Sequence, residues 1–389
     1  GDMTYHLFLS HEWGAAQDKV RVIKERLKET LPGIVVFLDV DDLEDIRDLE
    51  RCVMRSSYIL IYCSASYFQS RNCMVELLAA VQHHKQIISL MEPQTSQLDV
   101  RSWLEEAVGR FLDWGLPVDH HGSLSADELH SALCADGTIE WNSIVPLQDV
   151  TIRLVAERIL PKALQSNTYL HGELSKRALN LEAQRQQRYH VYCSSSNHGA
   201  GELISELIDA CSLKLSMTAD LQQLDQCDHM LVYLTSLTWC TEESAAFAAE
   251  IKLAMQKGVD LVLAHEMPGH DDIRTVMPAV DDEKPKRSTS KRRSSVPFSS
   301  LLKYGNGATP LELVRAGLYN EIAVPLHGSA WRRTSLTILA VGLGATTASE
   351  EALAKKLTRK SNIRLTAEKL FSKMQFWRGH QAEEAAADR

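Results

Sequence analysis

Glu76 is the residue whose place in the sequence most favours chemistry. An apolar run at residues 58–62 is followed by a polar stretch at 64–71, and an apolar helical segment begins at Asn72. Because the run is apolar throughout, it predicts a central strand of a parallel sheet covered on both faces. Glu76 then stands in the first turns of a helix just beyond the carboxyl end of that strand, where open α/β sheets place their ligand crevices. It is a candidate site residue, although a solvated helix residue is the commoner outcome at such a position.

A second polar group follows the first apolar run of the chain, residues 5–9. It consists of Ser10, His11, Trp13 and Gly14. Because parallel strands end at the same edge of a sheet, we expect these residues to lie near Glu76 and to line the same pocket. His11 also fits a capping or surface histidine, and Trp13 also fits a cover for its own loop.

Two further candidates are an acidic pair and a thiol. Asp41 and Asp42 belong to an acidic loop at 39–45, which we expect to be mobile and to gate the site or contact another protomer. Cys73 begins the helix of Glu76, where thiol pKa values are lowered and a nucleophilic role is open. No histidine is paired with Cys73 by the sequence, so a small buried residue is the simpler interpretation. Tyr67 and Phe68 are expected to be lids on the core.

The elements that must position these residues alternate between strand and helix. Strands are predicted at 5–9, 33–38, 58–62 and 86–91, with helices at about 18–29, up to about 55, and from 72 onward. This alternation predicts a doubly wound parallel sheet. An insertion at about 93–141 precedes a further helix, predicted at about 150–164.

The second half of the chain repeats this order. Residues 189–194 correspond to 5–10, 229–233 to 58–62, 260–264 to 86–91, and 323–326 to 144–147, where both segments contain Val-Pro-Leu. Matches in the same order predict tandem copies of one fold, with the second strand and acidic loop shortened in the second copy.

The second copy has its own candidate residues. Glu243, in the run Trp-Cys-Thr-Glu-Glu, and Glu250, found by aligning the helix ends, compete for the place of Glu76. The serine- and glycine-rich turn 194–201 precedes a predicted helix, so its backbone amides could bind a phosphate and make this copy a nucleotide sensor. A polar turn without a ligand is the ordinary alternative.

Composition limits the class of protein. The chain has 389 residues, 44% of them hydrophobic, and a net charge of -9, which argues against a general nucleic-acid or anionic-membrane binder. The longest apolar run, 336–344, is too short to span a bilayer, and we expect no signal peptide because the amino terminus lacks its charged and apolar regions. None of the eight cysteines is paired as Cys-x-x-Cys, which indicates a reduced, cytoplasmic compartment and no structural metal.

These patterns divide the chain into four parts. We expect a first domain at 3–165, a helical linker at 166–187, a second domain at 188–347 and a helical tail at 348–389. Within the second domain, residues 281–297 are charged and serine-rich, which predicts a disordered loop.

Three motifs of the first domain together resemble the TIR (Toll/interleukin-1 receptor) family. They are the opening strand with Leu9 and Ser10, the loop 37–43 and the turn 70–77. The second half resembles the family only through strand order, as a degenerate copy. The resemblance implies two tandem flavodoxin-like α/β domains, each with a parallel sheet of about five strands and helices on both faces, followed by the tail helix.

TIR domains are either scaffolds that signal by assembly or enzymes that cleave NAD at the nicotinamide bond. Glu76 matches the glutamate that is essential in the enzymes, whereas plant members commonly have tryptophan where this chain has Asn72. The resemblance implies an NAD⁺ glycohydrolase that is active on association with itself or with other TIR domains, with NAD as substrate and no cofactor. The alternative is a non-catalytic TIR scaffold.

One carboxylate is enough for that reaction. Glycosidases use two acidic groups because an alkoxide leaving group must be protonated, whereas nicotinamide leaves a cationic pyridinium as a neutral molecule. The site then needs only to hold the ribose and stabilise the positive charge that grows on its anomeric carbon. The product, linear or cyclic ADP-ribose, is left open by the sequence.

Overall fold

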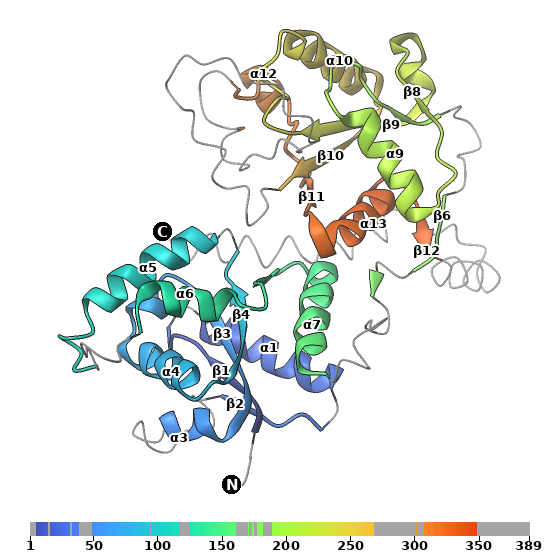
Figure 1. Ribbon diagram of the computed structural model, residues 1–389. Helices are drawn as coiled ribbons and strands as arrows, with labels where there is room; N and C mark the ends of the chain where they lie inside the picture. The colour runs from blue at the N-terminus through green and yellow to red at the C-terminus, as the bar shows by residue number, and fades with distance from the viewer. Residues whose placement is uncertain are drawn as a thin grey trace.

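The computed structural model describes residues 5–14, 16–31, 33–38, 49–93, 95–116, 124–160, 170, 173–174, 177–181, 189–267, 301 and 307–347. They form two modules, each built on a five-stranded parallel sheet with helices on both faces (Figure 1). The predicted fold class is therefore confirmed. The acidic loop with Asp41 and Asp42, the segment 281–297 and the tail 348–389 lie outside the described residues.

The first module alternates strictly between strands and helices up to its insertion. Its strands, in the spatial order β2-β1-β3-β4-β5, are β1 (Tyr5–Ser10), β2 (Val36–Leu38), β3 (Ser56–Cys63), β4 (Gln86–Met91) and β5 (Ile139–Glu140). Its helices are α1 (Gln17–Thr30), α3 (Leu49–Met54), η2 (Tyr67–Gln69), α4 (Arg71–Gln82), α5 (Gln97–Gly109), α6 (Ala126–Cys134) and α7 (Val145–Ile159). The strand order is that of flavodoxin-like folds, which bind ligands where the order reverses, between β1 and β3.

Two cores, one on each face of the sheet, explain why the strands are apolar throughout. Alternate residues of a strand point to opposite faces. In β3, Ile59 and Ile61 join the core beneath α4, whereas Leu60 and Tyr62 join the core beneath α1 and α7. The central strand must therefore be apolar on both faces, as the sequence is from Tyr58 to Cys63.

The second module has the same strand order. Its strands, in the order β11-β10-β9-β7-β8, are β7 (Tyr189–Tyr192), β8 (Met217–Thr218), β9 (Cys227–Leu234), β10 (Asp260–Glu266) and β11 (Val324–Leu326). Its helices are α9 (Ala200–Cys211), η4 (Leu221–Gln226), α10 (Ser244–Lys257), α12 (Leu311–Arg315), η6 (Ser329–Trp331) and α13 (Arg332–Gly342). When the strands of this module are numbered 1 to 5 in chain order, their spatial order is 5-4-3-1-2. This is the order of the first module read from the opposite edge, so the fold is repeated. The second strand of this copy is short, as predicted.

The correspondence predicted between the two Val-Pro-Leu segments is wrong. Val145 begins helix α7, with Pro146 in its first turn, and the fifth strand of this module is Ile139–Glu140 instead. In the second module the tripeptide forms strand β11, with Pro325 paired to His265 at the edge of the sheet. Proline is accepted in both places because neither the first turn of a helix nor the free side of an edge strand needs its missing N–H.

The joint between the modules, predicted to be helical, is extended where it is described next to the second module. Strand β6 (Leu179–Asn180) pairs antiparallel with β12 (Thr346–Thr347). This short ribbon places the start of the second module beside its end.

All eight cysteines are free thiols. Within the described ranges, no helix is both long and apolar enough to cross a bilayer.

Candidate functional site

Ser10 and Glu76 meet at the carboxyl edge of the first sheet. Ser10 is the last residue of β1 and pairs with Ile61 of β3, while Glu76 lies in the second turn of α4. The Ser10 Oγ donates a hydrogen bond to Glu76 Oε2 at 2.5 Å, across 66 positions of sequence. The end of the first strand and the glutamate of the helix therefore form one cluster.

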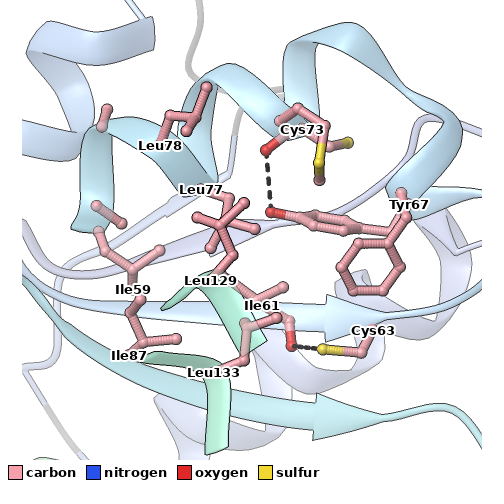
Figure 2. Close-up of a cluster of buried hydrophobic side chains, with 14 of the residues drawn as sticks. Ile59, Ile61, Cys63, Tyr67, Cys73, Leu77, Leu78, Ile87, Leu129 and Leu133 are labelled. Atoms are coloured by element: carbon pink, nitrogen blue, oxygen red, sulfur yellow. Dashed lines mark hydrogen bonds between the residues drawn. The ribbon is translucent and has the colours of Figure 1, made fainter. Parts of the chain in front are cut away.

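Tyr67 completes this cluster from the loop between β3 and α4. Its hydroxyl lies 2.8 Å from Ser10 Oγ and donates to the carbonyl oxygen of Cys73 at 3.2 Å, as Figure 2 shows for the second contact. Ser10 gives its only hydroxyl proton to Glu76, so Tyr67 shares its own proton between Ser10 and the Cys73 carbonyl. Burial raises the pKa of Tyr67 well above its ordinary value, and the nearby Cys73 and Glu76 add to this. Tyr67 is therefore a neutral donor.

Cys73 ties the start of α4 to the segment after β1. Its amide donates to Ser70 Oγ, which caps the helix, and its thiol donates to the carbonyl oxygen of His11 at 3.3 Å. Cys73 is buried. These contacts make Cys73 a structural donor that fixes the position of His11 relative to the helix.

The predicted pocket residues differ sharply in exposure. Ser10 and Glu76 are each 1% exposed and His11 is 0% exposed, whereas Trp13 is 48% exposed. Gly14 is also at the surface, where an added Cβ would lie 2.8 Å from the carboxylate of Glu12. The structure thus brings Ser10, His11 and Glu76 into the interior and leaves Trp13 and Gly14 at the surface. Asp41 and Asp42 lie outside the described residues.

The environment beneath the cluster is apolar. Figure 2 shows the hydrophobic side chains that surround the inner face of α4, and the labelled ones include Ile59, Ile61, Leu77, Leu129 and Leu133. Such surroundings strengthen a hydrogen bond to a carboxylate and make an unpaired one costly. The sequence predicted the position of Glu76. It did not predict that the Tyr67 hydroxyl contacts Ser10, because the position of Tyr67 in the sequence also fits a residue that covers the core. A tyrosine in the loop directly after a strand's carboxyl end is the signal that could have identified it.

In the second module Glu250, and not Glu243, occupies the place of Glu76. The buried residues of α10 repeat those of α4 at the same spacing: Phe247, Ala248, Ile251 and Ala254 correspond to Cys73, Met74, Leu77 and Ala80. Glu250 accepts a hydrogen bond of 2.9 Å from the hydroxyl of Tyr192, in β7. Glu243 is exposed and lies 3.2 Å from His198. The second copy therefore pairs its glutamate with a tyrosine of the strand, whereas the first copy pairs its glutamate with Ser10, and Phe247 stands in the place of Cys73.

The turn 194–201 borders a cavity of about 350 Å³ at the start of α9. None of its lining residues, all of them described, is lysine or arginine, and Glu202 contributes a carboxylate. This lining does not favour a phosphate. No group of three or more metal-ligating side chains occurs in the part of the chain that the structure describes.

Fold and cluster together define the class of protein. It is a doubly wound α/β protein with tandem flavodoxin-like modules and a hydroxyl–carboxylate cluster at the carboxyl edge of the first sheet. Residues 7–109 match the family model described as TIR domain. The first module therefore contains a TIR domain; the match does not extend to the second module, which shares the strand order.

Solved structures of TIR domains also match the chain. One comprises the TIR domains of the activated Roq1 resistosome that directly recognizes the pathogen effector XopQ, with 16% identity, 40% of this chain and 100% of that chain covered, and a TM-score of 0.32. Another is the TIR domain of the Toll-related receptor TRR-2 from Hydra magnipapillata, with 16% identity, 22% of this chain and 70% of that chain covered, and a TM-score of 0.20. No curated protein matches the chain.

Proposed function

We propose that the first module is an NAD⁺ glycohydrolase in which Glu76 is the catalytic carboxylate. The observation that carries the proposal is the hydrogen bond between Ser10 and Glu76, which orients a buried carboxylate at the edge where doubly wound sheets bind ligands. The TIR domain at residues 7–109 supports it, because part of that family cleaves NAD.

In the proposed reaction the bond between the anomeric carbon and the nicotinamide nitrogen breaks, and both electrons leave with nicotinamide. The Glu76 carboxylate stabilises the positive charge that develops on the ribose and accepts hydrogen bonds from its hydroxyls. A water molecule then adds its oxygen to the anomeric carbon and releases a proton to solvent, which gives ADP-ribose. Ser10 and the neutral Tyr67 hold the carboxylate in place during these steps.

The burial of Glu76 sets a condition on this activity. At 1% exposure, the carboxylate can meet a ribose only after neighbouring side chains move. We propose that the described conformation is a resting state and that association of first modules opens the site. The substrate contacts proposed for the open state are Trp13, Gly14, Asp41 and Asp42.

The same burial favours a second candidate, a non-catalytic TIR scaffold. In that case the cluster of Ser10, Tyr67 and Glu76 is structural, because it joins β1, the loop after β3 and α4 by side-chain hydrogen bonds. Partner recruitment would then depend on the surface of the module and not on the carboxylate.

The first prediction separates these functions. Glu76→Gln keeps the size of the side chain and an oxygen that can accept from Ser10, but it removes the charge. Incubation of the full chain with NAD at high protein concentration or with a crowding agent is expected to release nicotinamide, and Glu76→Gln is expected to lower the rate by about 10²- to 10³-fold.

Glu250→Gln is the matched control, because Glu250 holds the equivalent place in the second module and accepts a comparable hydrogen bond. Its turnover should equal that of the wild-type chain. If wild-type protein releases no nicotinamide when concentrated and crowded, or if Glu76→Gln is as active as wild type, the enzymatic proposal is wrong. Unchanged binding to another TIR domain by Glu76→Gln would then support the scaffold.

A further inference from the structure

The two modules meet at topologically equivalent corners. In the first module, β5 is followed by Asn142 and helix α7; in the second, β11 is followed by His327, η6 and helix α13. Helices α7 and α13 contact each other, and Figure 1 shows the upper end of α7 close to α13 where the modules meet. Each copy of the fold therefore contributes the end of its fifth strand and the following helix to the contact between the modules.

A buried polar contact lies at this junction. Asn142 Nδ2 is 3.2 Å from His327 Nε2, and both side chains are buried. Burial, with the neighbouring His265 adding to it, lowers the pKa of His327 to about 4, so the imidazole is neutral at pH 7 and Nε2 accepts from the amide. Asn142 Oδ1 accepts from the backbone N–H of Ile144 at 3.1 Å, which fixes the orientation of the amide. Buried groups satisfied across a junction indicate a specific fit.

Trp331 provides a second contact across the junction between the modules. The indole of Trp331, in η6, packs against the hydrophobic core of the first module beneath α7, and its Nε1 donates to Thr151 Oγ1 at 3.2 Å. Thr151 in turn donates to the carbonyl oxygen of Glu140 in β5 at 2.9 Å. Trp331 is partly buried, and its N–H is satisfied across the junction. Tryptophans of this kind often dominate the binding energy of an interface.

We propose that the second module is a built-in partner that occupies the pairing surface of the first. We name this surface the fifth-strand corner, meaning Asn142, Ile144, Thr151 and helix α7. A contact between the same elements of two copies of one fold is what an isologous dimer interface looks like within a single chain. The occupant that the corner accepts when the second module leaves is the same corner of another copy of the chain.

The covalent link between the modules explains why the second module, and not another chain, occupies the fifth-strand corner. A module linked through a joint of a few tens of residues is present at an effective concentration of about millimolar, well above that of a second chain in dilute solution. Exposed apolar side chains remain at the margin of the corner, with Ile144 38% and Val145 36% exposed. This inference concerns assembly and does not depend on NAD cleavage.

Trp331→Ala in the full chain tests the proposal. The substitution removes the anchor, so the second module should separate from the corner and the freed corners should pair. We expect the radius of gyration measured by small-angle scattering to rise, and sedimentation analysis to show dimers with a dissociation constant at least about tenfold lower than that of wild type. Trp331→Phe, which keeps most of the ring packing and loses the N–H, should lie close to wild type.

A second substitution locates the contact. Adding Ile144→Lys to Trp331→Ala places a charge on the freed corner at an exposed position and should abolish the dimer. Asn142→Ala, on the other side of the junction, should shift the chain in the same direction as Trp331→Ala and provides the test if that variant does not fold. The proposal is overturned if the opened chain stays monomeric, if the folded variants stay closed, or if the dimer survives Ile144→Lys.

Discussion

At the scale of the residue, the hydrogen bond from Ser10 to Glu76 decides how the carboxylate is held. A hydrogen bond to a charged group contributes about 1.5–3 kcal/mol, and the loss of one partner in an apolar interior leaves the other uncompensated. The Ser10 hydroxyl, which donates to Glu76, also accepts a hydrogen bond from the Tyr67 hydroxyl. Ser10 therefore links the strand, the loop and the helix through one oxygen.

This linkage predicts strong coupling between Ser10 and Tyr67. Ser10→Ala is expected to destabilise the first module by about 1–3 kcal/mol and Tyr67→Phe by about 1 kcal/mol, because the first removes a hydrogen bond to a carboxylate and the second removes one between neutral groups. The double variant should be less destabilised than the sum, since both substitutions remove the same contact. Urea unfolding of the four proteins measures this; strict additivity would mean that the two hydroxyls do not interact.

The sequence predicted the positions of Ser10, His11 and Glu76 because all three follow from where strands end. It did not predict Tyr67 as their partner, because a side-chain hydrogen bond depends on the path of the loop between β3 and α4. The same limit applies to Cys73, whose thiol contact with the His11 carbonyl depends on the backbone after β1.

At the scale of the element, strands and helices were predictable and short motifs were not. Alternating apolar runs predicted β1, β3, β4 and α4 within one or two residues at most ends. Val-Pro-Leu misled the alignment of the copies because proline suits both a helix start and an edge strand. Strand β5 went unrecognised since it has only two residues and follows an insertion.

Strand β5 carries a prediction about pH. Burial raises the pKa of Glu140 to about 7 from its ordinary 4.5, so the folded state binds more protons than the unfolded state between these values. Stability should therefore fall as pH rises through this window, with a cost above pH 7 of about 1–3 kcal/mol. Glu140→Gln should raise the thermal stability of the first module at pH 8 and leave it unchanged at pH 4. An equal effect at both values would contradict the assignment.

At the scale of the whole molecule, each module has its own pair of cores. Residues of the second module form two clusters, one beneath α10 and one beneath α9 and α13, separate from those of the first. The sequence predicted the duplication from strand order. The docking of the copies was not predictable, because Trp331 and His327 occur in a polar stretch whose partners lie about 180 residues earlier.

Separate cores predict separate unfolding. Phe247 is fully buried in α10 and its ring centroid lies 5.6 Å from that of Trp239. Phe247→Ala should destabilise the second module by about 3–5 kcal/mol and leave the first largely unaffected. Amide hydrogen exchange should show lost protection in β9 and α10 and retained protection in β3 and α4. Equal loss in both modules would mean that the chain unfolds as one unit.

The outermost strands of both sheets are very short. β5 and β8 have two residues each, and β2 and β11 have three, one of which is Pro325. An edge strand of this length exposes few main-chain groups to which a foreign strand could add, and a proline removes one donor more. Growth of a cross-β fibril from the folded state is thereby disfavoured, so any ordered polymer that this chain builds should retain its native circular dichroism and fail to bind amyloid dyes.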